Sequence, residues 1–595
     1  MKFKELAYFI EQIEQTSSRL TITHLLSDLY KKLNPDEIEK TCYLLQGRVV
    51  PLFEKTEFSL AEKTVTKAVA LALNLERTLF ENTYKKLGDL GQTVEYFKKE
   101  IRLFDEKDLT ILEVYESLFS LAKENGPGSQ ERKINILVGL IRQLDPLSTR
   151  YLVRIPIGVL RLGFSDMTVL DAFSWMITGN KSLRSVIEQA YHVRPDLGFI
   201  GKTLKEKGME GLKTTKPKIF TPIIMMRAER LSSGSEIIEK IGECAIQQKF
   251  DGFRLQVHYS KKNQEVRLYS RNLEEVSHMY PDIIEGVKKE VKADEIIFEG
   301  EAIGFDPLTN NFLPFQETVQ RKRKYDIEEK AKEIPLKLFA FELLFCDGTN
   351  YIHTFYRERR SILKKVIVVK GDSSENTLLI APEKILDREK DIEIEFDDAV
   401  SKGLEGIIAK KLDGVYQPGA RGWNWIKFKR SYSSKIEDTI DCLVMGYDFG
   451  KGKRTDFGIG AFLVGVLNEK EDTFVTVAKI GTGLSDVEWR TLQTEAQKSR
   501  VKDRPSRYNV DKQMVVDVWI QPEIVVEIRA DEISRSPVHT AGRVMKLSKS
   551  GQAKEVDIPG FALRFPRLER FRDDKRPEDV TTLKELEKMF TIQKK

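Results

Sequence analysis

The spacing of apolar residues changes near residue 205, and this change limits the folds that the chain can adopt. Before it, apolar side chains recur three and four residues apart, as in Leu6, Phe9, Ile10 and Ile13. That spacing places them on one face of a helix. Glycine and proline rarely interrupt this part of the chain. Residues 1–215 are therefore predicted to form an all-α domain built from short antiparallel helices.

A different pattern follows a polar segment, residues 204–222, which is rich in Gly, Lys, Thr and Pro and is predicted to be a linker. Beyond it, short β-rich runs alternate with helical stretches such as 391–401. The clearest runs are EVRLYS (265–270), EIIFEGEAIGF (295–305) and LKLFAFELLF (336–345). Residues 216–432 are therefore predicted to form an α+β domain with antiparallel sheets.

The last part of the chain, from about Ile436, consists of short strands separated by turns rich in Gly and Lys. The strands are predicted at 441–450, 461–468, 473–481 and 523–533. This spacing is typical of a small all-β barrel or sandwich, here assigned to residues 433–595. A length of 595 residues is consistent with three domains.

Composition excludes some classes of protein and leaves others open. The net charge is only +5, so charge alone does not identify a nucleic-acid-binding protein, although a local basic surface could still act as one. The sequence contains no run of about 18 apolar residues, so no membrane span is expected, and the N-terminus does not resemble a signal peptide. Four cysteines lie far apart and predict neither a zinc cluster nor a disulfide framework: Cys42, Cys244, Cys346 and Cys442. A cytoplasmic protein is expected.

The segment Lys249-Phe250-Asp251-Gly252-Phe253-Arg254 carries the strongest chemical signal. A lysine is a nucleophile when its amine is neutral, and burial and nearby positive charge both favour that form. Gly252 permits a tight turn, so Arg254 can reach the same phosphate as Lys249. Taken alone, the segment is equally compatible with a surface turn that carries one ion pair.

Further motifs occur in a fixed order between Lys249 and Lys429. They are Ser270-Arg271-Asn272, Glu299-Gly300-Glu301, Phe341-Glu342, Glu405-Gly406, and the stretch YQPGARGWNWIKFK with Arg421, Trp425, Lys427 and Lys429. Singly, each has an ordinary structural explanation, since a Phe in an apolar strand is usually core and alternate lysines of a strand often face solvent. As an ordered set, they resemble the covalent nucleotidyltransferase superfamily of ATP-dependent DNA ligases, RNA ligases and mRNA capping enzymes.

The resemblance implies a role for each of these residues. Lys249 would attack the α-phosphorus of ATP, expel pyrophosphate and carry AMP, while Phe341 would stack on the adenine. Glu301 and Glu405 are oxygen ligands suited to Mg²⁺, and Glu301 is also a candidate for binding the ribose. The remaining cations would bind ribose or phosphate oxygens, and the lysines would also favour the neutral amine of Lys249: Arg254, Arg271, Arg421, Lys427 and Lys429.

Position 247 departs from the pattern of these families, which typically carry Glu two residues before the nucleophile, where it contacts the adenine. Here the residue is Gln247. A Gln carbonyl can accept a hydrogen bond from the adenine amino group, but its amide could also turn and donate to a guanine carbonyl. ATP is the expected substrate, and the selectivity for the base stays open.

The C-terminal segment 563–580 contains Arg572 and Lys575 in an R-x-D-K sequence. This sequence resembles the final motif of the same superfamily, which belongs to a mobile OB-fold domain and approaches the pyrophosphate of ATP. Asp441 and residues 446–465 resemble the first strands of that domain. We expect nearby cations to meet a nucleic-acid backbone: Lys451, Lys453 and Arg454.

Four stretches of the helical part resemble the DNA-binding domain of archaeal and eukaryotic DNA ligases: 44–51, 126–133, 152–173 and 198–208. Such a domain would contact the backbone of nicked duplex DNA without reading its sequence. The expected protein is a monomeric ATP-dependent DNA ligase that seals 5′-phosphate/3′-hydroxyl nicks in replication, repair and recombination. Lysyl-AMP and a DNA–adenylate would be its intermediates.

Two other functions remain compatible with the sequence, namely an RNA ligase of the same superfamily and a non-catalytic nick-binding protein. An ordinary P-loop ATPase is not expected, because no G-x-x-x-x-G-K-[ST] sequence occurs. An NAD-dependent ligase is not expected either, because the scattered cysteines form no zinc module. A sliding clamp is a possible partner, although residues 100–110 show no clear clamp-binding pattern.

Overall fold

The computed structural model describes residues 1–16, 18–101, 106–160, 162–306, 311–313, 315–322, 326–369, 376–402, 404–429, 439–450, 458–481, 484–547 and 554–593. The chain forms two compact units. The first comprises Met1–Arg230 and Gly234–Lys427, and the second comprises Leu231–Ser233 and Phe428–Lys595.

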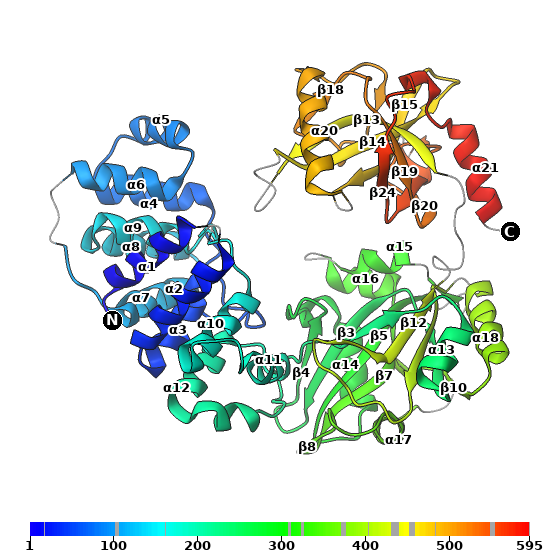
Figure 1. The fold of residues 1–595 in the computed structure, drawn as a ribbon, viewed down its shortest axis with the longest axis horizontal. Helices are drawn as coiled ribbons and strands as arrows, with labels where there is room; N and C mark the ends of the chain where they lie inside the picture. Colours follow the sequence, from blue (N-terminus) through cyan, green and yellow to red (C-terminus); the bar gives the residue numbers. More distant parts are fainter. Residues whose placement is uncertain are drawn as a thin grey trace. The chain divides into compact units, whose positions relative to one another are not determined.

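The N-terminal part of the first unit is helical, as predicted (Figure 1). Leu6, Ile10 and Ile13 form the buried face of the first helix, so the apolar spacing of the sequence becomes a packed helical core. The helices are α1 (Phe3–Glu14), α2 (Arg19–Lys32), α3 (Pro35–Leu45), α4 (Glu62–Leu73), α5 (Arg77–Leu87), α6 (Leu90–Glu100), α7 (Ile111–Lys123), α8 (Ser129–Gln143), α9 (Pro146–Arg154), α10 (Asp166–Thr178), α11 (Arg184–Val193) and α12 (Leu197–Lys213).

The prediction of a linker over residues 204–222 is wrong for its first half. Helix α12 continues to Lys213, with a kink at Gly208, whose φ of 59° and ψ of −156° are not helical. Leu204 and Leu212 are buried on either side of the kink, and their burial keeps this polar stretch folded against the helical core. The high content of Gly and Lys therefore marks a bent helix and not a free connection.

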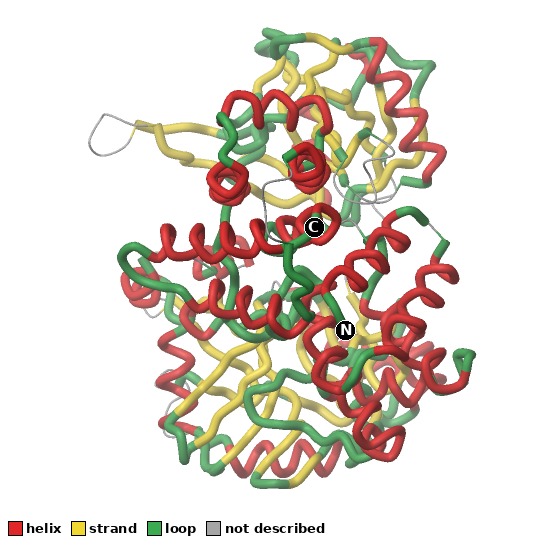
Figure 2. Tube along the Cα trace, turned by 90° about the vertical axis from the view of Figure 1, so that its left-hand side faces the viewer, coloured by secondary structure: helices red, strands yellow, loops and turns green. Residues whose placement is uncertain are grey.

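Two sheets follow in the first unit, and Figure 2 shows their strands packed among helices. One sheet has the strand order β1 (Arg227–Arg230), β12 (Arg421–Lys429), β11 (Gly406–Lys411), β2 (Cys244–Lys249) and β10 (Glu383–Leu386). The other has the order β4 (Glu265–Ser270), β3 (Phe253–Ser260), β5 (Glu295–Asp306), β7 (Leu336–Cys346) and β8 (Thr349–Asn350), with β6 (Asn311–Phe312) beside β5 and β9 (Leu378–Ile380) beside β7.

Helices cover the outer faces of these sheets and leave their inner faces to meet. Val287 of α14 and Leu363 of α17 pack on Val257 and Leu338 of the second sheet. On its other face, a separate apolar cluster includes Trp425 of the first sheet. The helices are α13 (Gly234–Ile241), α14 (Pro281–Glu290), α15 (Phe315–Thr318), α16 (Ile327–Glu333), α17 (Tyr356–Val366) and α18 (Glu389–Ser401).

The second unit is rich in strands, as the sequence predicts. Its main sheet has the order β16 (Arg500–Val501), β18 (Val518–Ile520), β13 (Ile440–Phe449), β14 (Ile459–Asn468), β15 (Thr473–Ile480) and β17 (Tyr508–Asn509), and β19 (Val525–Arg529) pairs with both β13 and β24 (Arg567–Phe571). Two further pairs are β20 (Glu532–Ser536) with β23 (Gly560–Arg564) and β21 (Val544–Leu547) with β22 (Lys554–Ile558). Helices α20 (Asp486–Lys498) and α21 (Leu583–Gln593) contribute Trp489 and Leu586 to its core.

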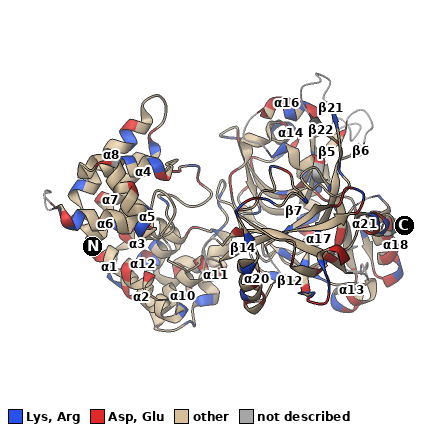
Figure 3. Ribbon diagram, turned by 90° about the horizontal axis from the view of Figure 1, so that it is seen from above, with Lys and Arg blue, Asp and Glu red and all other residues tan. Residues whose placement is uncertain are grey.

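Basic and acidic residues are interspersed along the helices (Figure 3), and their nearly equal numbers, 97 and 92, give the small net charge. None of the helices in the described part of the chain combines the length and apolar character that crossing a bilayer requires.

Candidate active site

Lys249 is the last residue of β2, and the first residue of β11 lies opposite it. The two strands are antiparallel, with Gly406 in register with Lys249. The N–H of Glu405 donates to the carbonyl of Lys249 (3.3 Å), and the Glu405 side chain forms an ion pair with the Lys249 amine. About a fifth of the Lys249 side chain is exposed, so the amine is held in place and still accessible.

A glycine is required at position 252 because the backbone of β5 lies very close to it, and not because its backbone angles are unusual. A Cβ atom at this position would lie 2.2 Å from the carbonyl oxygen of Ala302 in β5, which is far inside contact distance. The Lys249–Arg254 segment therefore runs directly against the backbone of β5. The sequence prediction identified the right residue and gave a different reason, the permissive backbone of glycine.

Arg254, in β3, is fixed by a buried carboxylate. Its Nη2 donates to Glu299 Oε2 (2.7 Å) and its Nη1 donates to the carbonyl of Met226 (2.8 Å). Burial lowers the pKa of Arg254, but Glu299, Tyr416 and Glu301 together outweigh that effect, and the net result is a raised pKa. Glu299 is fully buried and also accepts from Gln256 and from the Tyr416 hydroxyl (3.2 and 3.0 Å).

Glu301, in β5, and Glu405, immediately before β11, both interact with the Lys249 amine. Glu301 is in register with Arg254. Burial raises the pKa of Glu301 to about 7; the positive charges of Lys249 and Arg254 oppose that rise, and Glu405 adds to it. Two carboxylates and two cations thus interact in one small volume. That arrangement attracts a phosphate or a divalent cation.

Phe341, in β7, stands beside these charged groups with its ring partly accessible. The Arg254 guanidinium lies 5.5 Å from the centre of the ring, and Trp425 packs edge-on at 6.0 Å. Lys410, a buried residue of β11, donates to the Phe341 carbonyl (2.8 Å) and lies 4.9 Å from the ring centre. Burial lowers the pKa of Lys410 to about 7.

Gln247 is buried on the same face of β2 as Lys249, because the two residues are two positions apart in a strand. Its Nε2 donates to the Tyr356 hydroxyl (2.8 Å) and to Glu383 Oε2 (3.1 Å). The Tyr356 hydroxyl also donates to the same Glu383 oxygen. These three side chains form a closed hydrogen-bonded cluster.

The other cations that the sequence indicates lie at element ends. Arg271 is exposed in the turn after β4, and Arg421 is exposed at the start of β12 opposite Arg227. Lys427 and Lys429 are both partly buried near the end of β12, on one face of the strand.

Arg572 and Lys575, in the second unit, share a carboxylate. Arg572 Nη1 and Lys575 Nζ contact the two oxygens of Asp441 (3.0 and 2.6 Å). Arg572 also forms a two-point bond with Asp574 (2.8 Å each). The R-x-D-K sequence therefore forms an ion-pair network tied to Asp441 of β13. Lys451, Lys453 and Arg454 lie outside the described residues.

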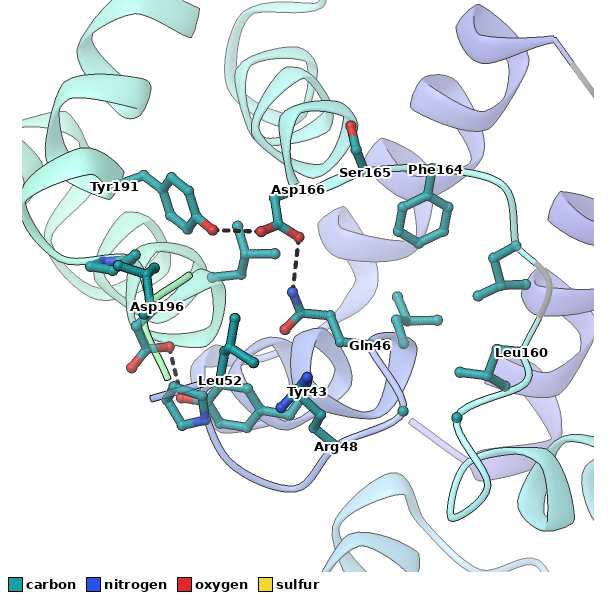
Figure 4. A pocket seen from close by; sticks show the side chains of 18 of the residues that line it. Tyr43, Gln46, Arg48, Leu52, Leu160, Phe164, Ser165, Asp166, Tyr191 and Asp196 are labelled. Carbon is teal, nitrogen blue, oxygen red and sulfur yellow. Dashed lines mark hydrogen bonds between the residues drawn. The ribbon is translucent and has the colours of Figure 1, made fainter. Parts of the chain in front are cut away.

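A cavity of about 410 Å³ is lined by residues of two of the four stretches that resemble a DNA-binding domain, 44–51 and 152–173 (Figure 4). Gln46 comes from the first stretch and Asp166 from the third, and they hydrogen-bond across the cavity (2.9 Å). Asp166 also accepts from Tyr191 (2.6 Å), and Asp196 accepts from Tyr43 (2.8 Å). These polar bonds hold distant segments of the chain around one concave surface.

Sequence reasoning did not single out Tyr356, Glu383 or Lys410. Each is more than 100 residues from Lys249 in the chain, and none belongs to a recognisable spacing with it. The pairing of β10 and β11 with β2 brings Glu383 and Lys410 to the site, and Tyr356 reaches it from the start of α17. The sequence offered one signal for Lys410: it lies within the β-rich run GIIAKK, where the neighbouring residues are apolar, and a lysine buried in such a run usually has a partner.

Comparisons with known proteins identify the family of this chain. Three family models match: "DNA ligase N terminus" at residues 2–174, "ATP dependent DNA ligase domain" at 225–429 and "ATP dependent DNA ligase C terminal region" at 455–575. A "Probable DNA ligase" of Dictyoglomus thermophilum is 45% identical over 100% of this chain and 98% of its own. A "DNA ligase" of Sulfurisphaera tokodaii is 39% identical with the same coverage.

A likeness of fold extends over almost the whole chain. The solved structure "Pmar-Lig_PreS3" superposes with a TM-score of 0.53 at 17% identity, covering 95% of this chain and 99% of that one. The chain belongs to the ATP-dependent DNA ligase family. Members of this family are enzymes that form phosphodiester bonds and seal nicks in DNA, a role typical of replication and repair.

Proposed function

We propose that this enzyme seals nicks in duplex DNA through an AMP group carried on Lys249. The observation that carries the proposal is the position of Lys249: an accessible amine at a strand end, paired with Glu405 and surrounded by Arg254 and Glu301. A lysine nucleophile beside a cation and two carboxylates has the groups that nucleotidyl transfer requires, namely a nucleophile, a phosphate-binding charge and ligands for a divalent cation.

In the first step, the Lys249 Nζ attacks the α-phosphorus of ATP, the N–P bond forms, and the bond to pyrophosphate breaks. The amine must first lose a proton, and the Glu405 carboxylate that pairs with it is the nearest acceptor. Arg254, held by Glu299, binds the phosphate or ribose oxygens, and Phe341 stacks on the base. Phosphoryl transfer depends mainly on such positioning and charge neutralisation.

Glu301 and Glu405 fit a Mg²⁺ ion. Glu405 forms an ion pair with Lys249, and Glu301 is close enough to interact with both Lys249 and Glu405. Mg²⁺ commonly uses one or two carboxylates and keeps several waters. Bound there, the ion would neutralise charge on the transferred phosphate.

The remaining cations are assigned to nucleotide binding in the same proposal, with the base read by Gln247. Arg271, Arg421, Lys427 and Lys429 would bind ribose or phosphate, while Arg572 and Lys575 would meet the departing pyrophosphate. The preformed network around Asp441 supports the last assignment, because it holds both cations in fixed positions before any nucleotide binds.

For the later steps, AMP passes from Lys249 to the 5′-phosphate of the nick, and the 3′-hydroxyl then attacks that phosphate and releases AMP. We assign residues 1–215 to binding of the DNA backbone, 216–432 to adenylation and 433–595 to an OB-fold domain. The cavity around Gln46 and Asp166 supports the first assignment. The pairing of β13 with both β14 and β19 supports the third. We also propose a cytoplasmic monomer.

The test is sealing of matched nicked substrates by the full chain with ATP and Mg²⁺. We expect joining of nicked duplex DNA that carries a 5′-phosphate, and no joining when that phosphate is absent. Joining of RNA ends alone would replace the proposal with an RNA ligase. Binding of nicks without joining, by a protein that takes no AMP, would replace it with a nick-binding protein.

A further inference from the structure

A buried cluster beside the nucleophile is not used by the steps above. We propose that Glu383 and Tyr356 lock the Gln247 amide with its oxygen towards the purine, so that the site selects adenine and rejects guanine. The inference rests on the proposed function, in which Gln247 reads the base, and it assigns to Glu383 and Tyr356 the role of positioning residues.

Strand β2 lies between β10 and β11 in the first sheet, and this pairing places Glu383 beside Gln247. Glu383 of β10 and Ile408 of β11 are both in register with Gln247 of β2. Directly paired residues share a face of a sheet, so Glu383 lies on the face that also carries Gln247 and Lys249. Tyr356, at the start of α17, reaches this face through its hydroxyl.

Chemistry decides which end of the Gln247 amide points at Glu383. A carboxylate only accepts hydrogen bonds, so the amide group facing it has to be the NH₂. The Tyr356 hydroxyl donates its single proton to Glu383, so towards Gln247 it too can only accept. Both contacts therefore require the same orientation, and a turned amide would place its oxygen against two acceptors.

The carboxylate that imposes this orientation is itself held firmly. Its Oε2 lies 3.4 Å from Arg360 Nε, and its Oε1 lies 3.9 Å from Lys364 Nζ. The side chain of Glu383 is only 8% exposed. Arg360 is anchored in turn by the carbonyls of Ala340 and Ala381. The buried Arg360 beside this carboxylate favours its charged form, which can only accept hydrogen bonds from the neutral amide.

The fixed amide has a direct consequence for base recognition. Its NH₂ group is occupied by Tyr356 and Glu383, which leaves Oε1 as the atom for the base. Adenine presents an amino donor at its 6-position, whereas guanine presents a carbonyl acceptor there. Guanine would therefore bring two acceptors together, and buried unpaired acceptors are costly.

The experiment measures covalent labelling of the full chain with α-labelled ATP and, separately, with α-labelled GTP, under single-turnover conditions. For wild type, we expect a preference for ATP of at least about 100-fold in the labelling rate. Glu383→Gln retains the shape but can present either end of its amide, so the preference should fall at least about tenfold. Tyr356→Phe should reduce it by a smaller factor, because Glu383 remains.

An exchange of the two groups gives the sharper test. Gln247→Glu alone places two carboxylates in contact and should slow labelling with ATP strongly. Adding Glu383→Gln to that variant restores a donor opposite an acceptor and should recover the rate and the preference for ATP. Glu395→Gln, which breaks the ion pair to the neighbouring Lys384, is the matched control and should leave the preference unchanged.

The outcomes separate this inference from the proposed function. If wild type takes label from neither nucleotide, the adenylylation proposal fails. If wild type takes label from ATP and Glu383→Gln keeps the same ratio of ATP to GTP labelling, only the role of Glu383 is overturned. An exchanged double variant no better than Gln247→Glu would overturn it as well.

Discussion

The buried partner of Arg254 allows a quantitative prediction for the first chemical step. Glu299→Gln preserves the shape of the side chain but removes the charge that Arg254 contacts at 2.7 Å. A hydrogen bond between charged groups contributes about 1.5–3 kcal/mol. Because Arg254 keeps its bond to Met226 and 19% of its side chain is exposed, we take about 2 kcal/mol as the loss.

That loss corresponds to about a 30-fold slower formation of the lysyl-AMP adduct, at about 1.4 kcal/mol for each tenfold change. The assay is single-turnover labelling with α-labelled ATP, measured for wild type and Glu299→Gln. Circular dichroism and the midpoint of urea unfolding establish that the variant is folded. Glu295→Gln, at the partly exposed start of the same strand, serves as a matched control and should keep the wild-type rate.

A double-mutant comparison tests whether Glu299 acts through Arg254. In a chain that already carries Arg254→Ala, Glu299→Gln should slow labelling by less than about threefold. It should also raise the stability of that chain, because it removes a buried carboxylate that has lost its cation. A further 30-fold loss in the Arg254→Ala background would refute the reasoning.

Two more predictions concern other parts of the chain. Arg572→Ala and Lys575→Ala should each slow labelling with ATP by at least about tenfold and leave sealing of a pre-adenylated nick largely intact, with equal losses in both assays contradicting the pyrophosphate assignment. Burial, aided by Arg267, lowers the pKa of His258 to about 3 from 6.5. Between these two pKa values, the unfolded chain binds a proton at this histidine that the folded chain does not bind. The free energy of unfolding of the first unit should therefore fall by about 1.4 kcal/mol for each pH unit as the pH falls from about 6.5 towards 3. Urea midpoints at pH 8 and pH 5 should show a smaller pH dependence for His258→Asn than for wild type, and identical dependences would contradict the prediction.

The sequence predicted elements best where one physical signal dominates. The helical spacing of Leu6, Ile10 and Ile13 became the buried face of α1, and the alternating run 265–270 became β4. It failed at 204–213, where Gly and Lys suggested a loop while two buried leucines kept the chain helical. Local composition cannot reveal such packing, because the partners are distant in the chain.

The candidate site, too, could be predicted from the sequence only in part. The groups proposed to face the substrate carry a recognisable order in the sequence, as with Lys249, Glu301 and Glu405. The groups that hold them in place do not, and Glu383 approaches Gln247 only through strand pairing. The orientation of the Gln247 amide depends on such contacts, so the proposal for base selectivity needed the fold.

The most direct test of the account is incubation with α-labelled ATP and Mg²⁺ followed by denaturing electrophoresis, for wild type and Lys249→Ala. We expect a labelled band at 68.5 kDa for wild type. The bond should survive denaturation, and the band should be absent for Lys249→Ala. Label that persists in Lys249→Ala, or a folded wild type that takes none, would contradict the assignment of Lys249 as the residue that carries AMP.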